Sequence, residues 1–158
     1  MKKVLIALDY NQTSQKVAEK GFSLAKSMDA EVTLLHVIAD ITYYSSLEYS
    51  PIVGFNSFSS TEFSQIIDTD GLKKASQYFL DRIKHHLDDK AVQTLIEEGE
   101  TADSILNAAK HLHADIIVMG SHSRRWLEQI LLGSVTEKVL HHTSIPLYII
   151  PTKKQNSQ

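Results

Sequence analysis

The chain has 158 residues, of which 42% are apolar, a formal net charge of −3 and no cysteine. Its length suits a single domain that buries about 70% of its unfolded surface, and the missing thiols exclude disulfides, iron–sulfur clusters, thiolate zinc sites and cysteine nucleophiles. No basic block exceeds two residues, which argues against nucleic-acid binding. The apolar run after Met1 is too short for a signal peptide or a membrane span, so we expect no membrane contact and a cytoplasmic location.

The first third of the chain predicts a strand, a helix and a second strand. Residues 4–8 form an apolar run that ends at Asp9, as expected of a strand covered on both faces. Apolar residues then recur at helical spacing over 17–28. Residues 32–38 predict another buried strand, in which we interpret His36 as a hydrogen-bonded core residue. Residues 40–69 have many serines and aromatics but no period, which is typical of a variable loop.

The remaining elements continue the alternation of helices and strands. They are predicted as a helix over 72–87, a strand over 91–96, a helix capped by Thr101, a strand over 115–119, a helix opening at Gly133 and Ser134, a strand over 147–150 and a polar tail over 153–158. This order indicates one α/β domain over 1–152, a parallel sheet with helices on both faces. In such sheets ligands bind beyond the carboxyl ends of the strands, where the strand order reverses.

One segment combines the features of an anion site. Gly120 leaves a predicted strand, and Gly133 and Ser134 open the following helix. Both ends of the segment can therefore direct backbone N–H groups and hydroxyls at one point. A helix N-terminus carries about half a positive charge and unsatisfied donors, which suit a phosphate.

The spacing Gly120-x2-Ser123-x9-Gly133-Ser134 resembles the ATP-binding loop of the universal stress protein family, in which two residues separate the first two glycines and nine precede a Gly-Ser or Gly-Thr pair. Other segments are similar to that family in the same order: the opening strand that ends in Asp9, Leu-Leu-His-Val at 34–37, Asp-Ile-Ile-Val-Met-Gly-Ser at 115–121 and Ile-Pro-Leu at 145–147. The resemblance covers most of the chain except 40–69, a region that varies in the family.

The resemblance implies a Rossmann-like, five-stranded sheet of order 3-2-1-4-5 and a site for ATP or AMP accompanied by Mg²⁺. Position by position, it implies that Ala7 and Asp9 lie beside base and ribose, Val37 contacts adenine, Met119 and Gly120 lie near ribose and base, Ser123, Gly133, Ser134 and Val135 hold the phosphates, and Arg124 adds positive charge. It also implies a homodimer that pairs through the last strand, residues 147–150.

Several assignments keep an alternative. Ser123 stands where the family has its second glycine. A left-handed backbone at this serine would cost about 1–2 kcal/mol. One hydrogen bond from its hydroxyl to phosphate, about 1.5–3 kcal/mol, could cancel that cost. We therefore expect binding, against the alternative of a family member that works through protein–protein contacts alone. His122 can touch a phosphate or face solvent. Asp9 can bind the ligand or cap the next helix, and Ser134 can contact phosphate, cap its helix or do both.

The sequence offers little catalytic machinery. It has no Gly-x-Ser-x-Gly elbow and no lysine after a glycine loop, so a nucleotide-dependent enzyme ranks behind a regulatory or stress-response module with at most slow ATP hydrolysis.

The adjacent histidine pairs, 85–86 and 141–142, fall near predicted helix ends, where positive charge is favourable. We therefore predict no protein metal site.

Overall fold

The computed structural model describes residues 1–39, 69–121 and 132–152. The predictions for the variable loop up to residue 68, for His122, Ser123 and Arg124, and for the tail after 152 lie outside these residues. Within the described ranges no helix is both long enough and apolar enough to cross a bilayer.

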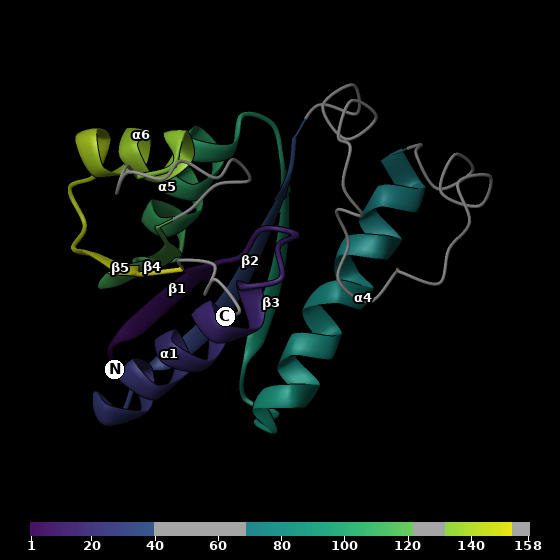
Figure 1. Cartoon of the computed structure of the whole chain (residues 1–158). Helices are drawn as coiled ribbons and strands as arrows, with labels where there is room; N and C mark the ends of the chain where they lie inside the picture. The colour runs from purple at the N-terminus through teal and green to yellow at the C-terminus, as the bar shows by residue number, and fades with distance from the viewer. Residues whose placement is uncertain (40–68, 122–131, 153–158) are drawn as a thin grey trace, which may run out of the picture.

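Strands and helices alternate along the chain, as the sequence predicted (Figure 1). The described elements are β1 (Lys3–Ala7), α1 (Ser14–Ser27), β2 (Glu31–Ile38), α4 (Thr69–Leu87), β3 (Gln93–Glu98), α5 (Thr101–His111), β4 (Ile116–Gly120), α6 (Ser134–His142) and β5 (Leu147–Ile150). All strand pairs are parallel, and the sheet has the order β3-β2-β1-β4-β5. The Rossmann-like fold and its strand order are thus confirmed.

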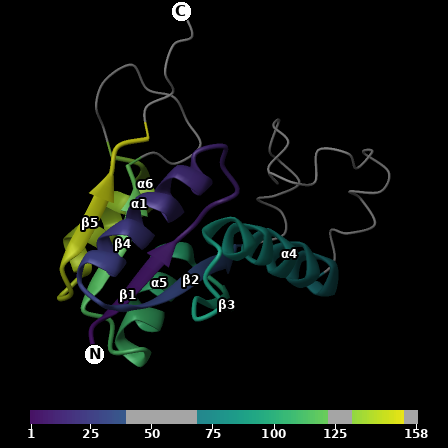
Figure 2. The ribbon, with the colours of Figure 1, turned by 90° about the horizontal axis from the view of Figure 1, so that it is seen from below.

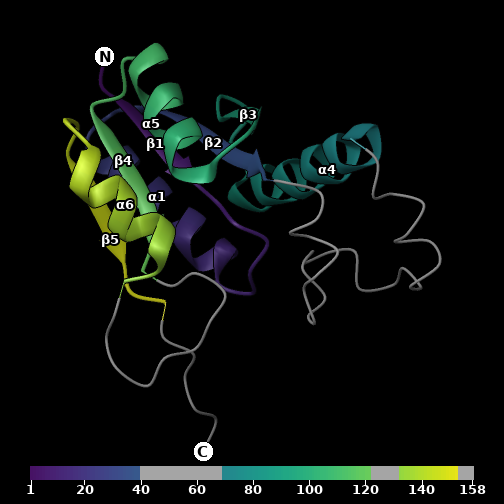
Figure 3. The same cartoon turned by 90° about the horizontal axis from the view of Figure 1, so that it is seen from above.

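The central strand β1 shows why the apolar run is continuous. Its residue Val4 pairs with Val32 of β2 on one side and with Ile116 of β4 on the other. Successive side chains point to opposite faces, so Ile6 packs in the core with α1 and α4 whereas Leu5 packs in the core with α5 and α6. Figures 2 and 3 show these two helix pairs on opposite faces of the sheet. Both faces of β1 are therefore buried, as its composition predicted.

A polar and aromatic cluster joins β1 and β2 to α4. The ring centroids of Tyr10 and His36 lie 4.0 Å apart, and that of Phe79 lies 5.0 Å from Tyr10. The hydroxyls of Tyr10 and Ser76 share a hydrogen bond. His36 is 2% exposed, and its Nδ1 lies 2.9 Å from the carbonyl oxygen of Leu8. The prediction of His36 as a hydrogen-bonded core residue is confirmed.

Two local predictions were wrong. The third strand begins at Gln93 and not at residue 91, because the Asp89 carboxylate accepts the N–H of Ala91 at 2.8 Å and holds that residue in the preceding turn. The helix α5 is capped by Glu100, whose carboxylate accepts the N–H of Asp103 at 2.7 Å, so Thr101 is its first helical residue and not its cap.

Candidate functional site

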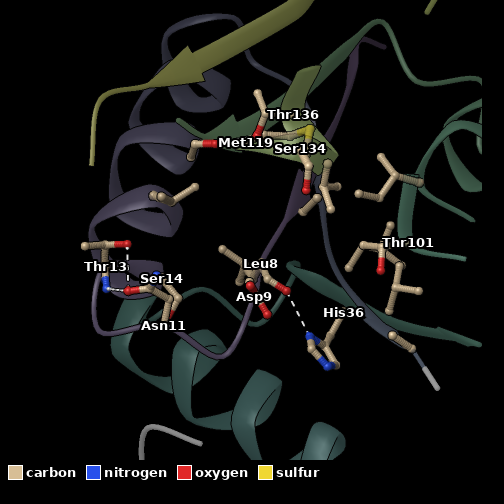
Figure 4. A pocket seen from close by; sticks show the side chains of 18 residues that line it. Leu8, Asp9, Asn11, Thr13, Ser14, His36, Thr101, Met119, Ser134 and Thr136 are labelled. Atoms are coloured by element: carbon tan, nitrogen blue, oxygen red, sulfur yellow. Dashed lines mark hydrogen bonds between the residues drawn. The ribbon is translucent and has the colours of Figure 1, made fainter. Parts of the chain in front are cut away.

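A cavity opens at the carboxyl ends of β1, β2 and β4 (Figure 4). The first residues of α1, α5 and α6 complete its wall. This is the point where the strand order reverses, since β1 is followed in the chain by β2 on one side and pairs with β4 on the other. All predicted site residues that the structure describes, except Gly133, line the cavity: Ala7, Asp9, Val37, Met119, Gly120, Ser134 and Val135.

Asp9 is held at the tip of β1 by the backbone around it. The N–H of Leu8 donates to the carbonyl of Leu35 at 2.8 Å, and the carbonyl of Leu8 faces His36 Nδ1. Because a carbonyl oxygen only accepts, Nδ1 is the protonated ring nitrogen of His36. The carboxylate of Asp9 accepts the N–H of Tyr10 at 2.8 Å. Among the described residues that line the cavity, Asp9 supplies the one carboxylate.

The helix-cap alternative for Asp9 does not hold. The N-cap of α1 is Thr13. Its N–H donates to the side-chain oxygen of Asn11 at 3.1 Å, so Asn11 and not Asp9 serves the turn before the helix. The carboxylate of Asp9 is therefore placed at the cavity and not at the first turn of α1.

The structure brings the two ends of the glycine segment together. The carbonyl of Ser121 accepts the N–H of Gly133 at 2.9 Å, and the hydroxyl of Thr136 donates to the carbonyl of Gly120 at 2.9 Å. The chain after β5 ties the same point, because the N–H of Thr152 donates to the hydroxyl of Ser121 at 3.0 Å. The end of β4 and the start of α6 thus form one connected unit beside the cavity.

The start of α6 presents backbone donors. Gly133 is the N-cap, and the first bond within the helix runs from the N–H of Glu137 to the carbonyl of Gly133 at 2.9 Å. The N–H groups of Ser134, Val135 and Thr136 precede that bond, so they have no acceptor inside the helix. Since Gly133 occupies the cap, Ser134 is the first helical residue and its exposed hydroxyl does not serve as the cap. These donors can bind an anion.

Beside this polar end the cavity has an apolar wall. Val37 of β2, Ile105 of α5 and Met119 of β4 contribute to it, and each is at most 6% exposed. Thr101 adds a hydroxyl to the same wall. An apolar pocket with a few converging polar groups suits a ligand that combines a flat ring with a charged end.

Sequence reasoning missed several polar residues of the cavity. Asn11, Thr13, Ser14 and Thr136 were not predicted as site residues, and Thr101 was predicted only as a helix cap. A signal was available: each lies within a few residues of a strand's carboxyl end or at the start of a helix that follows one. Hydroxyl and amide residues at such positions can cap a helix or face a ligand, and the spacing alone does not separate the two.

The described residues contain no group of three His, Asp or Glu side chains placed to hold a metal ion. The histidine pairs lie in the last turns of α4 and α6, as their spacing predicted. Mg²⁺ binds through one or two carboxylates together with substrate phosphates. Asp9 fits that donor set only in company with a phosphate ligand.

Comparison with known proteins agrees with this architecture. A model described as the universal stress protein family matches residues 1–151. Universal stress protein MJ0531 of Methanocaldococcus jannaschii is 31% identical over 98% of this chain and 84% of its own length, and universal stress protein YxiE of Bacillus subtilis is 32% identical over 94% and 97%. The structure of protein MJ0577 of Methanocaldococcus jannaschii superposes with a TM-score of 0.72 at 26% identity, covering 98% of both chains. A universal stress protein in complex with cAMP shares the fold, with a TM-score of 0.61 at 17% identity over 96% of this chain and 98% of that one.

Proposed function

Since the chain belongs to the universal stress protein family, we propose that it is a regulatory or stress-response module that binds ATP or another adenine nucleotide in this cavity. One observation carries the proposal: the carboxylate of Asp9 and the first turn of α6 line the same cavity, at the point where the strand order of the sheet reverses. An acid suited to ribose hydroxyls and free backbone donors suited to phosphate then serve one ligand.

Each wall of the cavity has a role in this proposal. Adenine packs against Val37 and Met119 on the apolar side. Asp9 accepts hydrogen bonds from the ribose. The phosphates lie at the start of α6, where the hydroxyl of Ser134 and the N–H of Val135 donate. Mg²⁺ arrives with the phosphates, because Asp9 alone is too small a donor set.

We further propose that the protein acts through its nucleotide-bound state and that it hydrolyses ATP only slowly. In the part of the chain that the structure describes, the cavity wall has one carboxylate, and the proposal assigns it to the ribose. Turnover above about 1 s⁻¹, ordinary for an enzyme, would favour the enzyme alternative.

Isothermal titration with ATP and with AMP, each with and without Mg²⁺, tests the proposal, and two variants of one residue sharpen it. Gly133 has φ −57° and ψ 154°, the extended conformation that a following proline requires. Ser134→Pro therefore fits the first position of α6 without strain while removing its N–H and hydroxyl. Ser134→Ala removes the hydroxyl alone and is the matched control.

We expect wild-type protein to bind ATP, Ser134→Ala to bind it more weakly and Ser134→Pro to bind it most weakly, with similar thermal stability in all three. The absence of nucleotide binding by wild-type protein would reject the proposal and favour a module that works through protein–protein contacts. Equal binding by all three proteins would place the phosphates elsewhere.

The family resemblance also supports a homodimer through β5. This strand is an edge of the sheet, and its Tyr148 is 45% exposed. Pairing across a two-fold axis would cover that edge. Light scattering checks this, and a mass of 17.8 kDa, that of one chain, would contradict it.

A further inference from the structure

The cavity has a second polar end, at the start of α1, to which the proposed nucleotide site assigns no part. Asn11, Thr13 and Ser14 line it there, to the left of Asp9 in Figure 4, whereas Ser134 and Thr136 lie above Asp9. Because α1 and α6 pack on opposite faces of the sheet, their first turns approach the cavity from different sides. A ligand that reaches both turns must therefore span the cavity between them.

Ser14 is the residue that indicates a ligand at this end. It is only 4% exposed, and its side chain lines the cavity. Within the described ranges its hydroxyl makes no hydrogen bond, although its N–H donates to the carbonyl of Asn11 at 3.0 Å. The hydroxyl opens onto the cavity and not into the packed core, so a ligand in the cavity can reach it. A ligand atom in the cavity is the partner that this position offers.

The first turn of α1 favours a negative charge on that ligand. Its N-cap, Thr13, makes no side-chain bond to the helix, and no acidic residue lies in the turn. Lys16 lies there instead, where a cation is unfavourable to the helix dipole. By contrast, α5 starts at the same cavity but carries its own anion, the Glu100 carboxylate bonded to the N–H of Asp103.

We propose that Ser14 and the first turn of α1 form a second anion-binding point, so that the cavity prefers a nucleoside triphosphate to a monophosphate. This inference rests on the proposed nucleotide site. One phosphate occupies one helix start at a time, whereas a chain of phosphates held at α6 can also reach the hydroxyl of Ser14. Ser14 is then a residue that sets specificity for the length of the phosphate chain.

The test compares the dissociation constants for ATP and AMP, each with Mg²⁺, in wild-type protein and Ser14→Ala. We expect the variant to bind ATP about tenfold more weakly, as for the loss of one hydrogen bond to a charged group, and AMP less than about twofold more weakly. Its melting temperature without ligand should stay within about 2 °C of wild type, since no hydrogen bond within the protein is lost. The matched control is Ser76→Ala, the same change at a buried serine that does not line the cavity; it should lower stability and leave the ATP-to-AMP ratio unchanged.

A second pair of variants tests the charge at the helix start. Lys16→Glu and Lys20→Glu make the same charge change at two exposed positions of α1, but only residue 16 lies in the first turn. We expect Lys16→Glu to raise the melting temperature and weaken ATP binding more than Lys20→Glu does.

The possible outcomes separate the two claims. If wild-type protein binds neither nucleotide, the proposed function itself fails. If it binds both and Ser14→Ala weakens them by the same factor or by none, the nucleotide site stands and the second anion-binding point is rejected. Equal effects of Lys16→Glu and Lys20→Glu on ATP binding would also reject it.

Discussion

The hydrogen bond between Thr136 and Gly120 connects the start of α6 to the end of β4, and a single substitution can remove this bond alone. Thr136 is 3% exposed, and its hydroxyl donates to the carbonyl of Gly120 at 2.9 Å. Thr136→Val keeps the shape of the side chain and removes this donor. A carbonyl that loses its donor in a partly buried position costs about 1–3 kcal/mol at most. For a chain of this size, about 2 kcal/mol lowers the melting temperature by about 4–8 °C.

Thermal and urea unfolding followed by circular dichroism measure that loss, and titration with ATP measures its effect on the site. We expect Thr136→Val to lower both stability and affinity, because β4 and α6 carry the two ends of the proposed phosphate-binding segment. Thr136→Ser is the control: it keeps the hydroxyl, loses one methyl group at about 1 kcal/mol and should retain affinity. A Thr136→Val protein with wild-type stability and affinity would refute the role given to this bond.

Four further variants address the packing, the helix cap and the proposed ribose contact. A Cβ at Gly120 would lie 3.0 Å from Thr152 Cγ2, and one at Gly21 would lie 2.8 Å from Ile6 Cδ1, so unfolding should show both alanine variants destabilised by about 1–3 kcal/mol. Only Gly120→Ala should also lose ATP affinity. Equal ATP affinities of the two variants would contradict the place of Gly120 in the site. Partial burial raises the pKa of Glu100, but the N–H of Asp103 and the charge of Lys138 outweigh this effect and hold the pKa below its usual value. The difference in stability between wild type and Glu100→Gln should therefore be full at neutral pH and vanish as the pH falls through the lowered pKa. A difference that persists in acid would refute the cap. Asp9→Asn should weaken adenosine binding about tenfold and leave 2′,3′-dideoxyadenosine binding unchanged in a competition assay, whereas equal losses for both would argue against a ribose contact.

The buried strands were predictable because both faces of the sheet are covered. Residues 4–8 and 115–119 are nearly all apolar, and the structure places β1 and β4 beside each other at the centre of the sheet. Their order was not a property of composition: it came from the family resemblance. The start of β3 was misplaced because the Asp89 side chain holds Ala91 in a turn, a local bond that an apolar run does not reveal.

The candidate site was predictable where a residue type marks the end of a strand or the start of a helix. Gly120 ends β4, Gly133 is the N-cap of α6, and Asp9 lies two residues after the end of β1. The hydroxyl residues were missed for the opposite reason. Ser14 and Thr136 lie at helix starts, where they resemble caps, and only the packing of α1 and α6 on opposite faces shows that both line one cavity.

A crystal structure of the protein with ATP and Mg²⁺ tests the central claim most directly. We predict a phosphate oxygen within about 3.2 Å of the N–H of Val135 and a ribose hydroxyl at a similar distance from the carboxylate of Asp9. Nucleotide density outside the cavity, or phosphates directed away from the first turn of α6, would contradict the account.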